Sequence, residues 1–322
     1  MNIYVPHMIF GELLTSDNYD DAEDRITGGR NGFGAKLTNI FSKEFIVQCG
    51  DSSRKKEFKM TWSDNMSKFS EPHIKNYNGK DYVKVTFKPD LNKFGMTEMD
   101  DDIESLLFKR VYDLAGTCSV RVYLNGQRLA VKDFKSYVDL YLKDNSNDNK
   151  NNKGQNDNNN NNNNNNDENA NQNNDNLDVS LSNEPADGTP TKNNNNNNNN
   201  NDEDEIVKIH EKQHRWEIVV SKSDGSQFQQ VSFVNSICTT KGGSHVNYIV
   251  EQLLSSLSKK ANAKNKGGME IKSGHIRNHL WVFVNCLIVN PTFDSQTKET
   301  LTTKPVKFGS KCILSDKTIN NV

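Results

Sequence analysis

Residues 27–37 read Thr-Gly-Gly-Arg-Asn-Gly-Phe-Gly-Ala-Lys-Leu and form the densest glycine cluster in the chain. Successive glycines let backbone N–H groups turn inward around an anion, and a helix that starts at about Ala35 would add its own free N–H groups and its dipole. Arg30 and Lys36 could supply positive charge, and Asn31 a side-chain amide. This chemistry suits a nucleotide triphosphate, while a flexible turn between two helices is the structural alternative.

The cluster matches neither of the two common phosphate-binding motifs. Gly34 is followed by Ala35 where a P-loop has Lys-Ser/Thr, and Gly32-x-Gly34 is followed by Leu37 where the dinucleotide fingerprint has its third glycine. Phosphate binding is therefore predicted from the backbone chemistry of the cluster and not from a known motif.

Hydrophobic periodicity predicts strands and helices on both sides of the chain's middle. In the first half it predicts strands over 44–49, 57–62 and 82–87, a helix over 100–114, and a hairpin turn at 125–126. In the second half it predicts strands over 216–220, 230–234 and 280–289, with an amphipathic helix over 245–260 preceded by an N-cap at Ser244. A strand, a helix and another strand in that order indicate a crossover between parallel strands.

A polar tract at about 145–204 separates the two halves and consists largely of asparagine with scattered Asp, Glu, Lys and Ser. Such a composition cannot bury a core. Although only 33% of the whole chain is hydrophobic, nearly all of those residues lie outside the tract, so we expect two foldable blocks. The tract is itself a candidate for self-association.

Several classes of protein are excluded by simple features. The first basic residue is Arg25, so no signal peptide is predicted, and the longest apolar stretch, 280–289, is too short to span a bilayer. No Ser/His/Asp or Cys/His set indicates a hydrolase with its own nucleophile, and the histidines lack metal-ligand spacing. The cysteines lie in no CxxC pair and are expected to be reduced, mostly buried thiols of an intracellular protein: Cys49, Cys118, Cys238, Cys286 and Cys312.

Positive charge is concentrated near the end of the chain. Residues 241–322 hold 12 Lys+Arg against 5 Asp+Glu, a local charge of +7, whereas the whole chain carries −2. Lysines cluster after the 245–260 helix, where they either complement the helix dipole or contact a phosphate backbone. In Gln296-Thr-Lys298, a lysine on a loop after a buried strand can reach a phosphate, although such a lysine taken alone is usually a solvated surface residue.

Six motifs, in their order and spacing, closely resemble eukaryotic DNA topoisomerase II, along the whole chain apart from the asparagine tract. They are Leu14-Thr-Ser-Asp-Asn-Tyr-Asp20, Thr27-Gly-Gly-Arg-Asn-Gly-Phe-Gly-Ala-Lys36, Val83-Lys-Val-Thr-Phe-Lys-Pro-Asp90, Val122-Tyr-Leu-Asn-Gly126, Phe233-Val-Asn-Ser236 and Asn290-Pro-Thr-Phe-Asp-Ser-Gln-Thr-Lys298.

The resemblance implies an α+β fold in three parts. Residues 1–143 would be the later part of an incomplete histidine-kinase/gyrase-type ATPase domain, an α/β two-layer sandwich that includes the ATP lid. Residues 144–204 would be a disordered tract, and 205–322 a ribosomal-protein-S5-like transducer domain. The implied function is the ATP-binding part of a nuclear type II DNA topoisomerase, coupling ATP binding and hydrolysis to DNA strand passage. A truncated module that only dimerises or contacts DNA is the alternative.

The resemblance also implies site residues. Nucleotide contacts carried over are Ser16, Asp17, Asn18, Gly29, Arg30, Asn31, Gly32, Phe33, Gly34, Ala35, Lys36, Gln296, Thr297 and Lys298. The family usually has serine where this chain has Asp17, which adds a negative charge. Lys298 is implied to reach the γ-phosphate and sense hydrolysis, so it is the expected catalytic residue.

Partners and cofactors follow from the same resemblance. Asn262, Ala263 and Lys264 align with a basic DNA-contacting triplet of which only Lys264 keeps its charge, and Lys266 is a further expected contact. The expected cofactors are ATP and Mg²⁺, and the expected partners are double-stranded DNA and a second copy in a homodimer, with no membrane. The family's general-base glutamate, magnesium-binding asparagine and cleavage tyrosine match no position here. We therefore expect part of a longer enzyme that is inactive alone.

Overall fold

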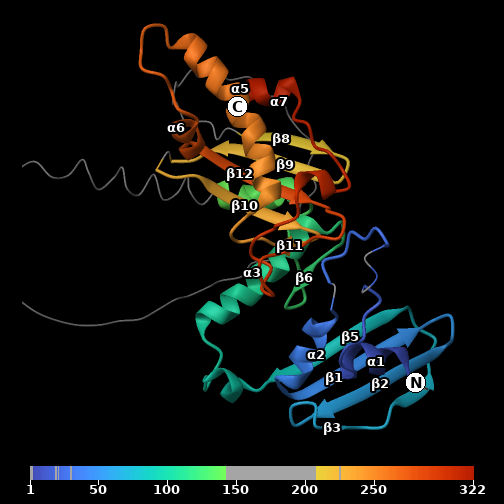
Figure 1. The fold of residues 1–322 in the computed structure, drawn as a ribbon. Coiled ribbons are helices and arrows are strands. Elements are labelled where there is room, and N and C mark those ends of the chain that lie inside the picture. The colour runs from blue at the N-terminus through green and yellow to red at the C-terminus, as the bar shows by residue number, and fades with distance from the viewer. Residues whose placement is uncertain (1–2, 19, 21, 30, 143–207, 225) are drawn as a thin grey trace, which may run out of the picture. The chain divides into compact units, whose positions relative to one another are not determined.

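The structure is a computed structural model that describes residues 3–18, 20, 22–29, 31–142, 208–224 and 226–322 (Figure 1). The asparagine tract lies outside these residues, so the expectations about it concern a part of the chain that is not described. Residues 1–141 and 207–322 belong to one compact unit.

The first sheet follows two short helices, α1 (Val5–Gly11) and α2 (Phe33–Ile40). Its strands are β1 (Ser42–Asp51), β2 (Lys56–Ser63), β3 (Lys68–Phe69), β4 (His73–Asn76) and β5 (Tyr82–Pro89). They pair antiparallel in the order β3-β2-β1-β5, with β4 also on β2. Alternate residues of β1 and β2 bury a core of Phe45, Val47, Phe58, Met60 and Trp62. The three strands expected here are confirmed.

A longer helix, α3 (Asp101–Thr117), follows the short 3-10 helix η1 (Leu91–Phe94), and the hairpin expected at 125–126 forms between β6 (Tyr123–Leu124) and β7 (Gln127–Arg128). The helix begins where its acidic first turn predicts, because Asp100 accepts a hydrogen bond from the Ile103 amide. Leu106, Leu107 and Leu114 of this helix are exposed, however, whereas its buried residues include the charged Asp113.

The second sheet contains β8 (Lys208–Gln213), β9 (Trp216–Lys222), β10 (Gln229–Val234), β11 (Ile237–Cys238) and β12 (Leu280–Cys286) in the order β11-β10-β12-β9-β8. Strands β10 and β12 run parallel, and the long helix α5 (Ser244–Lys264) lies between them in sequence, so the expected crossover is confirmed. Three short helical segments complete this part: α6 (Ser273–Asn278), η2 (Pro305–Lys307) and α7 (Asp316–Asn321).

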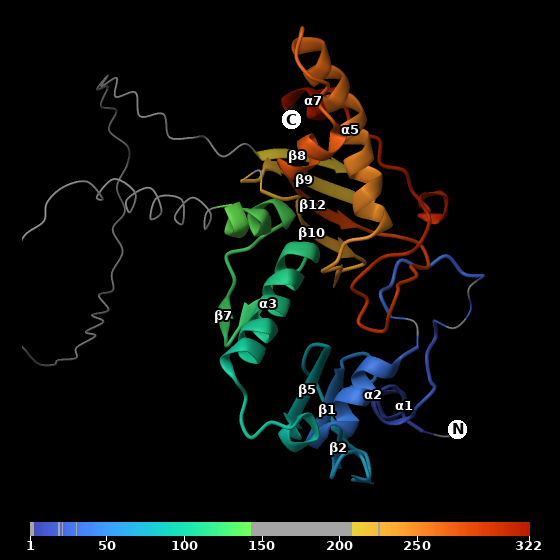
Figure 2. The same ribbon diagram turned by 60° about the vertical axis from the view of Figure 1, so that its left-hand side comes forward.

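Helices cover both faces of this second sheet (Figure 2). On one face, Val282 and Val284 of β12 pack in a core with α5 residues such as Ile249. On the other face, the rings of Trp281 and Phe283 contact Tyr141, whose segment 134–142 is helical. Because successive strand residues point to opposite faces, a strand covered on both sides is mostly apolar, as β12 is apart from Asn285.

The start of α5 differs from the sequence expectation. Its N-cap is Gly243, with φ +135°, and Ser244 is the first helical residue. The predicted N-cap serine is therefore wrong by one position. The Ser244 hydroxyl instead donates to the Thr303 carbonyl at 2.6 Å, and a Cβ at Gly243 would lie 2.4 Å from the Leu301 carbonyl oxygen. This close approach, together with the positive φ, requires glycine.

Candidate functional site

The glycine loop ends in a turn that only glycine fits. Gly32 has φ +65° and is the N-cap of α2, which begins at Phe33, two residues earlier than expected. A Cβ on Gly32 would lie 2.4 Å from the Thr15 carbonyl oxygen. The glycine therefore lets the start of α2 approach the backbone of the segment that follows α1.

The buried side chain of Lys36 stabilises this close approach of the two backbone segments. Its side chain is 2% exposed, and its Nζ donates to the Thr15 carbonyl at 2.9 Å and the Gly32 carbonyl at 3.1 Å. Burial lowers the pKa of the Lys36 ammonium. No carboxylate within the described part of the chain forms an ion pair with it, so the charge is balanced by carbonyl dipoles alone.

The segment 16–18 lies against the same loop. Asn18 donates from Nδ2 to the Gly29 carbonyl at 2.8 Å, and the Asn18 amide donates to Ser16 Oγ at 3.1 Å. Asp17 between them is exposed. The structure therefore brings Ser16 and Asn18 together with the glycine loop, as the sequence motifs suggested, whereas Arg30 lies outside the described residues.

Two glycines of the loop are not required by the protein's own packing. Apart from their chain neighbours and, for Gly34, the backbone of its own helix α2, no heavy atom of the described residues lies within 4 Å of the position that a Cβ would occupy at Gly29 or Gly34, and neither glycine has a positive φ. Both are exposed, while Asn31, Phe33 and Ala35 are half-buried. Open space over glycine backbone is the arrangement that lets a ligand approach main-chain N–H groups.

Lys298 reaches the glycine loop from the other end of the chain. Its Nζ donates to the Gly28 carbonyl at 2.8 Å, across 270 positions of sequence. Burial lowers the pKa of this ammonium, and no carboxylate forms an ion pair with it among the residues that are described. Lys298 has φ +59° and ends a turn in which its amide donates to the Ser295 carbonyl, while Gln296 and Thr297 are exposed.

Two asparagines, Asn290 and Asn235, form hydrogen bonds with residues 25–27, just before the glycine loop. The sequence indicated no role for either of them. The side-chain Oδ1 of Asn290 accepts a hydrogen bond from the Arg25 backbone N–H at 3.3 Å. The backbone N–H of Asn290 donates to the Arg25 carbonyl at 2.9 Å. Asn235 donates to the Thr27 carbonyl at 3.2 Å and to the Ile288 carbonyl at 2.9 Å. Both asparagines stand in the quoted motifs, so position in a motif was the available signal.

A small cavity lies against the glycine loop. It has about 30 Å³ and lies beside Gly28 and Gly29, lined also by Asn18, Arg25 and Thr27 among others. Ligand pockets usually have about 300–1,000 Å³, so this cavity by itself is too small for a nucleotide.

The residues expected to contact DNA lie at the end of α5. Ala263, Lys264 and Lys266 are exposed. Asn262 points inward, where its Nδ2 donates to the Ser258 carbonyl at 3.0 Å and its Oδ1 accepts from the Ile271 amide at 2.8 Å. The arrangement leaves the two lysine ammonium groups accessible, while Asn262 fixes the loop after the helix.

Within the described ranges, no three His, Cys, Asp or Glu side chains gather as a metal site would require. No helix there is long and apolar enough to cross a membrane. The five cysteines are free thiols, three of them buried.

The sequence of the chain is similar to those of known DNA topoisomerases. The DNA gyrase B family model matches residues 188–321. DNA topoisomerase 2 of Penicillium chrysogenum is 47% identical over 98% of this chain, and human DNA topoisomerase 2-alpha is 44% identical over 98%. In each case the chain spans only 17% of the relative's length.

The solved structures that match are closer to this chain in length than the full-length relatives are. The crystal structure of the ATPase region of Saccharomyces cerevisiae topoisomerase II matches with a TM-score of 0.75 and 40% identity, covering 99% of this chain and 68% of that one. The ATPase and transducer domains of topoisomerase II from Balamuthia mandrillaris match with a TM-score of 0.75 and 39% identity. The chain therefore belongs to the type II DNA topoisomerase family, within its ATPase region.

Proposed function

We propose that this chain binds the triphosphate of ATP between the glycine loop, residues 28–36, and Lys298. The contact of the Lys298 ammonium with the Gly28 carbonyl at 2.8 Å carries the proposal, because it brings a lysine from the far end of the chain to the glycine loop. A γ-phosphate would replace that carbonyl, since a charge-assisted hydrogen bond is stronger than one to a neutral oxygen.

The other expected contacts take distinct roles in this proposal. The backbone at Gly29 and Gly34 is exposed and has open space where a side chain would stand, so phosphate oxygens would approach the main chain there. Lys36 is engaged with two carbonyls, so it shapes the loop and adds positive charge nearby. Mg²⁺ would arrive with ATP, and we assign it no ligand on this chain.

The larger role is proposed from the family. The curated relatives are topoisomerases, and the chain would serve such an enzyme in the nucleus, as a homodimer acting on double-stranded DNA. Loss of the γ-phosphate would free Lys298 and let the second sheet move relative to the loop. The divisions 1–143, 144–204 and 205–322 stay our proposed ATPase, tract and transducer segments, and Lys264 and Lys266 our proposed DNA contacts.

Nucleotide binding is expected to take up protons at alkaline pH. The pKa values of Lys36 and Lys298 lie below the 10.5 of a free lysine because both are buried. A bound triphosphate favours the charged forms and raises these pKa values again. Over the pH range in which the free lysines lose protons and the bound ones keep them, binding therefore consumes protons and weakens as the pH rises; the uptake falls towards lower pH as both states become protonated.

Isothermal titration of the chain with a non-hydrolysable ATP analogue tests the proposal. Titrations in two buffers of different ionisation enthalpy, at about pH 7 and about pH 9.5, measure the proton uptake. We expect binding at both pH values, with more proton uptake at the higher one, and less uptake in Lys298→Ala. Absence of binding heat at both pH values would exclude the chain from nucleotide binding by itself.

A further inference from the structure

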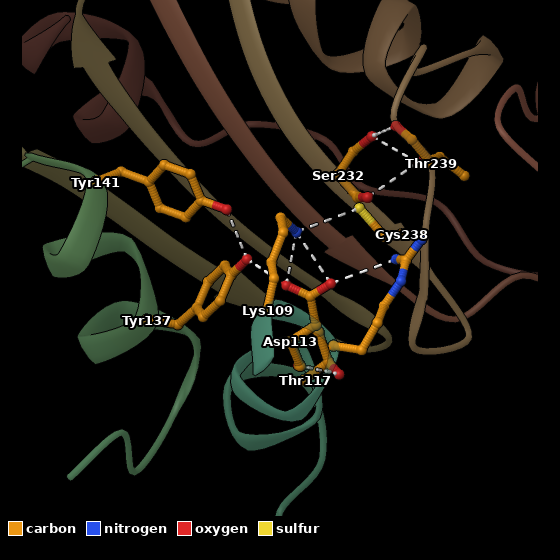
Figure 3. A network of polar contacts seen from close by, with 9 residues as sticks. Lys109, Asp113, Thr117, Tyr137, Tyr141, Ser232, Cys238 and Thr239 are labelled. Carbon is orange, nitrogen blue, oxygen red and sulfur yellow. Dashed lines mark hydrogen bonds and ion pairs between the residues drawn. The ribbon is translucent and has the colours of Figure 1, made fainter. Parts of the chain in front are cut away.

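A buried carboxylate, Asp113 of α3, is the centre of a polar network that the proposed function does not use (Figure 3). It accepts hydrogen bonds from Lys109 Nζ at 2.9 and 3.0 Å and from Tyr137 Oη at 2.6 Å. Arg110 Nη1 lies 3.4 Å away, and Tyr141 Oη lies 2.8 Å from Tyr137 Oη. A carboxylate is stable at such depth only while partners of this kind satisfy it.

The donors in this network keep their protons. Burial raises the pKa of Tyr137, and Tyr141 and Asp113 raise it further. Burial lowers the pKa of Lys109, but the hydrogen bond to Asp113 and the neighbouring groups together raise it by more. Tyr137 and Lys109 therefore donate to Asp113 throughout the neutral pH range.

The network joins α3 to the hairpin formed by β10 and β11. Lys109 Nζ lies 3.9 Å from Cys238 Sγ in β11, and the Tyr137 ring centroid lies 5.6 Å from that of Phe233 in β10. One helical turn beyond Asp113, Thr117 leads to Cys118, whose Sγ lies 3.5 Å from Ser236 Oγ in the turn of the hairpin. The helix thus approaches the hairpin through Lys109 and through Cys118 at its end, while Tyr137, which donates to Asp113, contacts the hairpin by its ring.

The turn that follows β11 holds the loop of Lys298. The Lys241 amide donates to the Glu299 carbonyl at 3.0 Å, and the Leu301 amide donates to the Gly242 carbonyl at 3.0 Å. The side chains of Lys241 and Glu299 also form an ion pair at 2.6 Å. The turn after the hairpin and the backbone next to Lys298 are therefore joined by main-chain hydrogen bonds.

Lys298 depends on such support because its own backbone is unfavourable. It has φ +59°, a region that residues with a Cβ seldom occupy. We propose that Asp113 is a positioning residue for Lys298: by seating α3 on the β10–β11 hairpin, it keeps the neighbouring turn where Lys298 can reach the nucleotide. This inference rests on the proposed function, but its first test does not.

Hydrogen exchange in the nucleotide-free chain is that first test. In Asp113→Asn, amides of residues 295–301 should exchange faster, on the order of three- to tenfold, while those of β9 keep their rates. Glu104→Gln removes an exposed charge from the same helix and should change neither region. Unchanged exchange at 295–301 in a folded Asp113→Asn variant would overturn the inference. Should that variant not fold, Tyr137→Phe removes one donor, keeps the ring, and is judged by the same criterion.

A double-mutant cycle is the second test. Asp113→Asn should weaken binding of a non-hydrolysable ATP analogue about fivefold in the wild-type background, and not at all in Lys298→Ala. An equal fivefold loss in both backgrounds would mean that Asp113 acts independently of Lys298, which overturns the inference and leaves the proposed function intact. If Lys298→Ala alone does not alter affinity, the proposed function fails, and the exchange measurement still decides the inference.

Discussion

Replacing Lys298 with alanine should weaken the binding of a non-hydrolysable ATP analogue by roughly 10- to 100-fold. Charge-assisted hydrogen bonds contribute about 1.5–3 kcal/mol each, and a difference of about 1.4 kcal/mol is tenfold in affinity. The half-buried position of this ammonium reduces its screening by solvent, which supports the upper part of the range. Part of the gain is offset because Lys298 must leave the Gly28 carbonyl, a neutral partner.

Isothermal titration measures this loss, and Lys304→Ala is the matched control. Lys304 is an exposed lysine only six positions along the chain, so its removal changes the net charge equally without reaching the glycine loop. Wild-type affinity is expected for the control. Equal affinities for Lys298→Ala and wild type would show that the cationic loop takes no part in binding.

The second large effect is expected on stability, from Gly243→Ala. The added Cβ would lie within 2.4–2.9 Å of three backbone atoms of Leu301, and the residue has φ +135°. Such a conformation costs about 1–3 kcal/mol without glycine, and a contact with backbone cannot relax by a rotamer change. We expect the free energy of unfolding to fall by roughly 3 kcal/mol, which lowers Tm by about 6–12 °C.

Thermal denaturation followed by circular dichroism measures the change, with Gly274→Ala as control. Gly274 lies in α6, has no positive φ, and has no atom within 4 Å of its Cβ position, so its variant should melt as the wild type does. A Gly243→Ala variant that keeps the wild-type Tm would contradict the close approach of this turn to the Lys298 loop.

The regular elements and the glycine loop could be predicted because their signals are local. In β1 and β2, core residues alternate with half-buried or exposed ones, and in β12 a run of five apolar residues before Asn285 follows from helices on both faces. The glycine loop was recognisable because its Gly-rich backbone has few other uses. The start of α5 was misplaced by one residue because serine is a common N-cap, and only the approach of Leu301 makes glycine necessary there.

The supports of the site could not be predicted because they depend on partners distant in sequence. Asp113 stands in a helix where an acidic side chain usually indicates a solvated face, and its burial follows from tyrosines more than twenty positions away. Asn235 contacts the Thr27 carbonyl across 208 positions, and Asn290 contacts Arg25 across 265. Buried polar side chains of this kind do not follow the hydrophobic periodicity of a helix or strand. Their roles can therefore be recognised only once the tertiary contacts are known.

A crystal structure of the chain with a non-hydrolysable ATP analogue tests the central claim most directly, by the distance from Lys298 Nζ to the nearest γ-phosphate oxygen. We predict about 2.7–2.9 Å, the length of a charge-assisted hydrogen bond, with the Gly28 carbonyl released and the phosphates over Gly29 and Gly34. An analogue bound elsewhere, with the Lys298 ammonium still on the Gly28 carbonyl, would contradict the account.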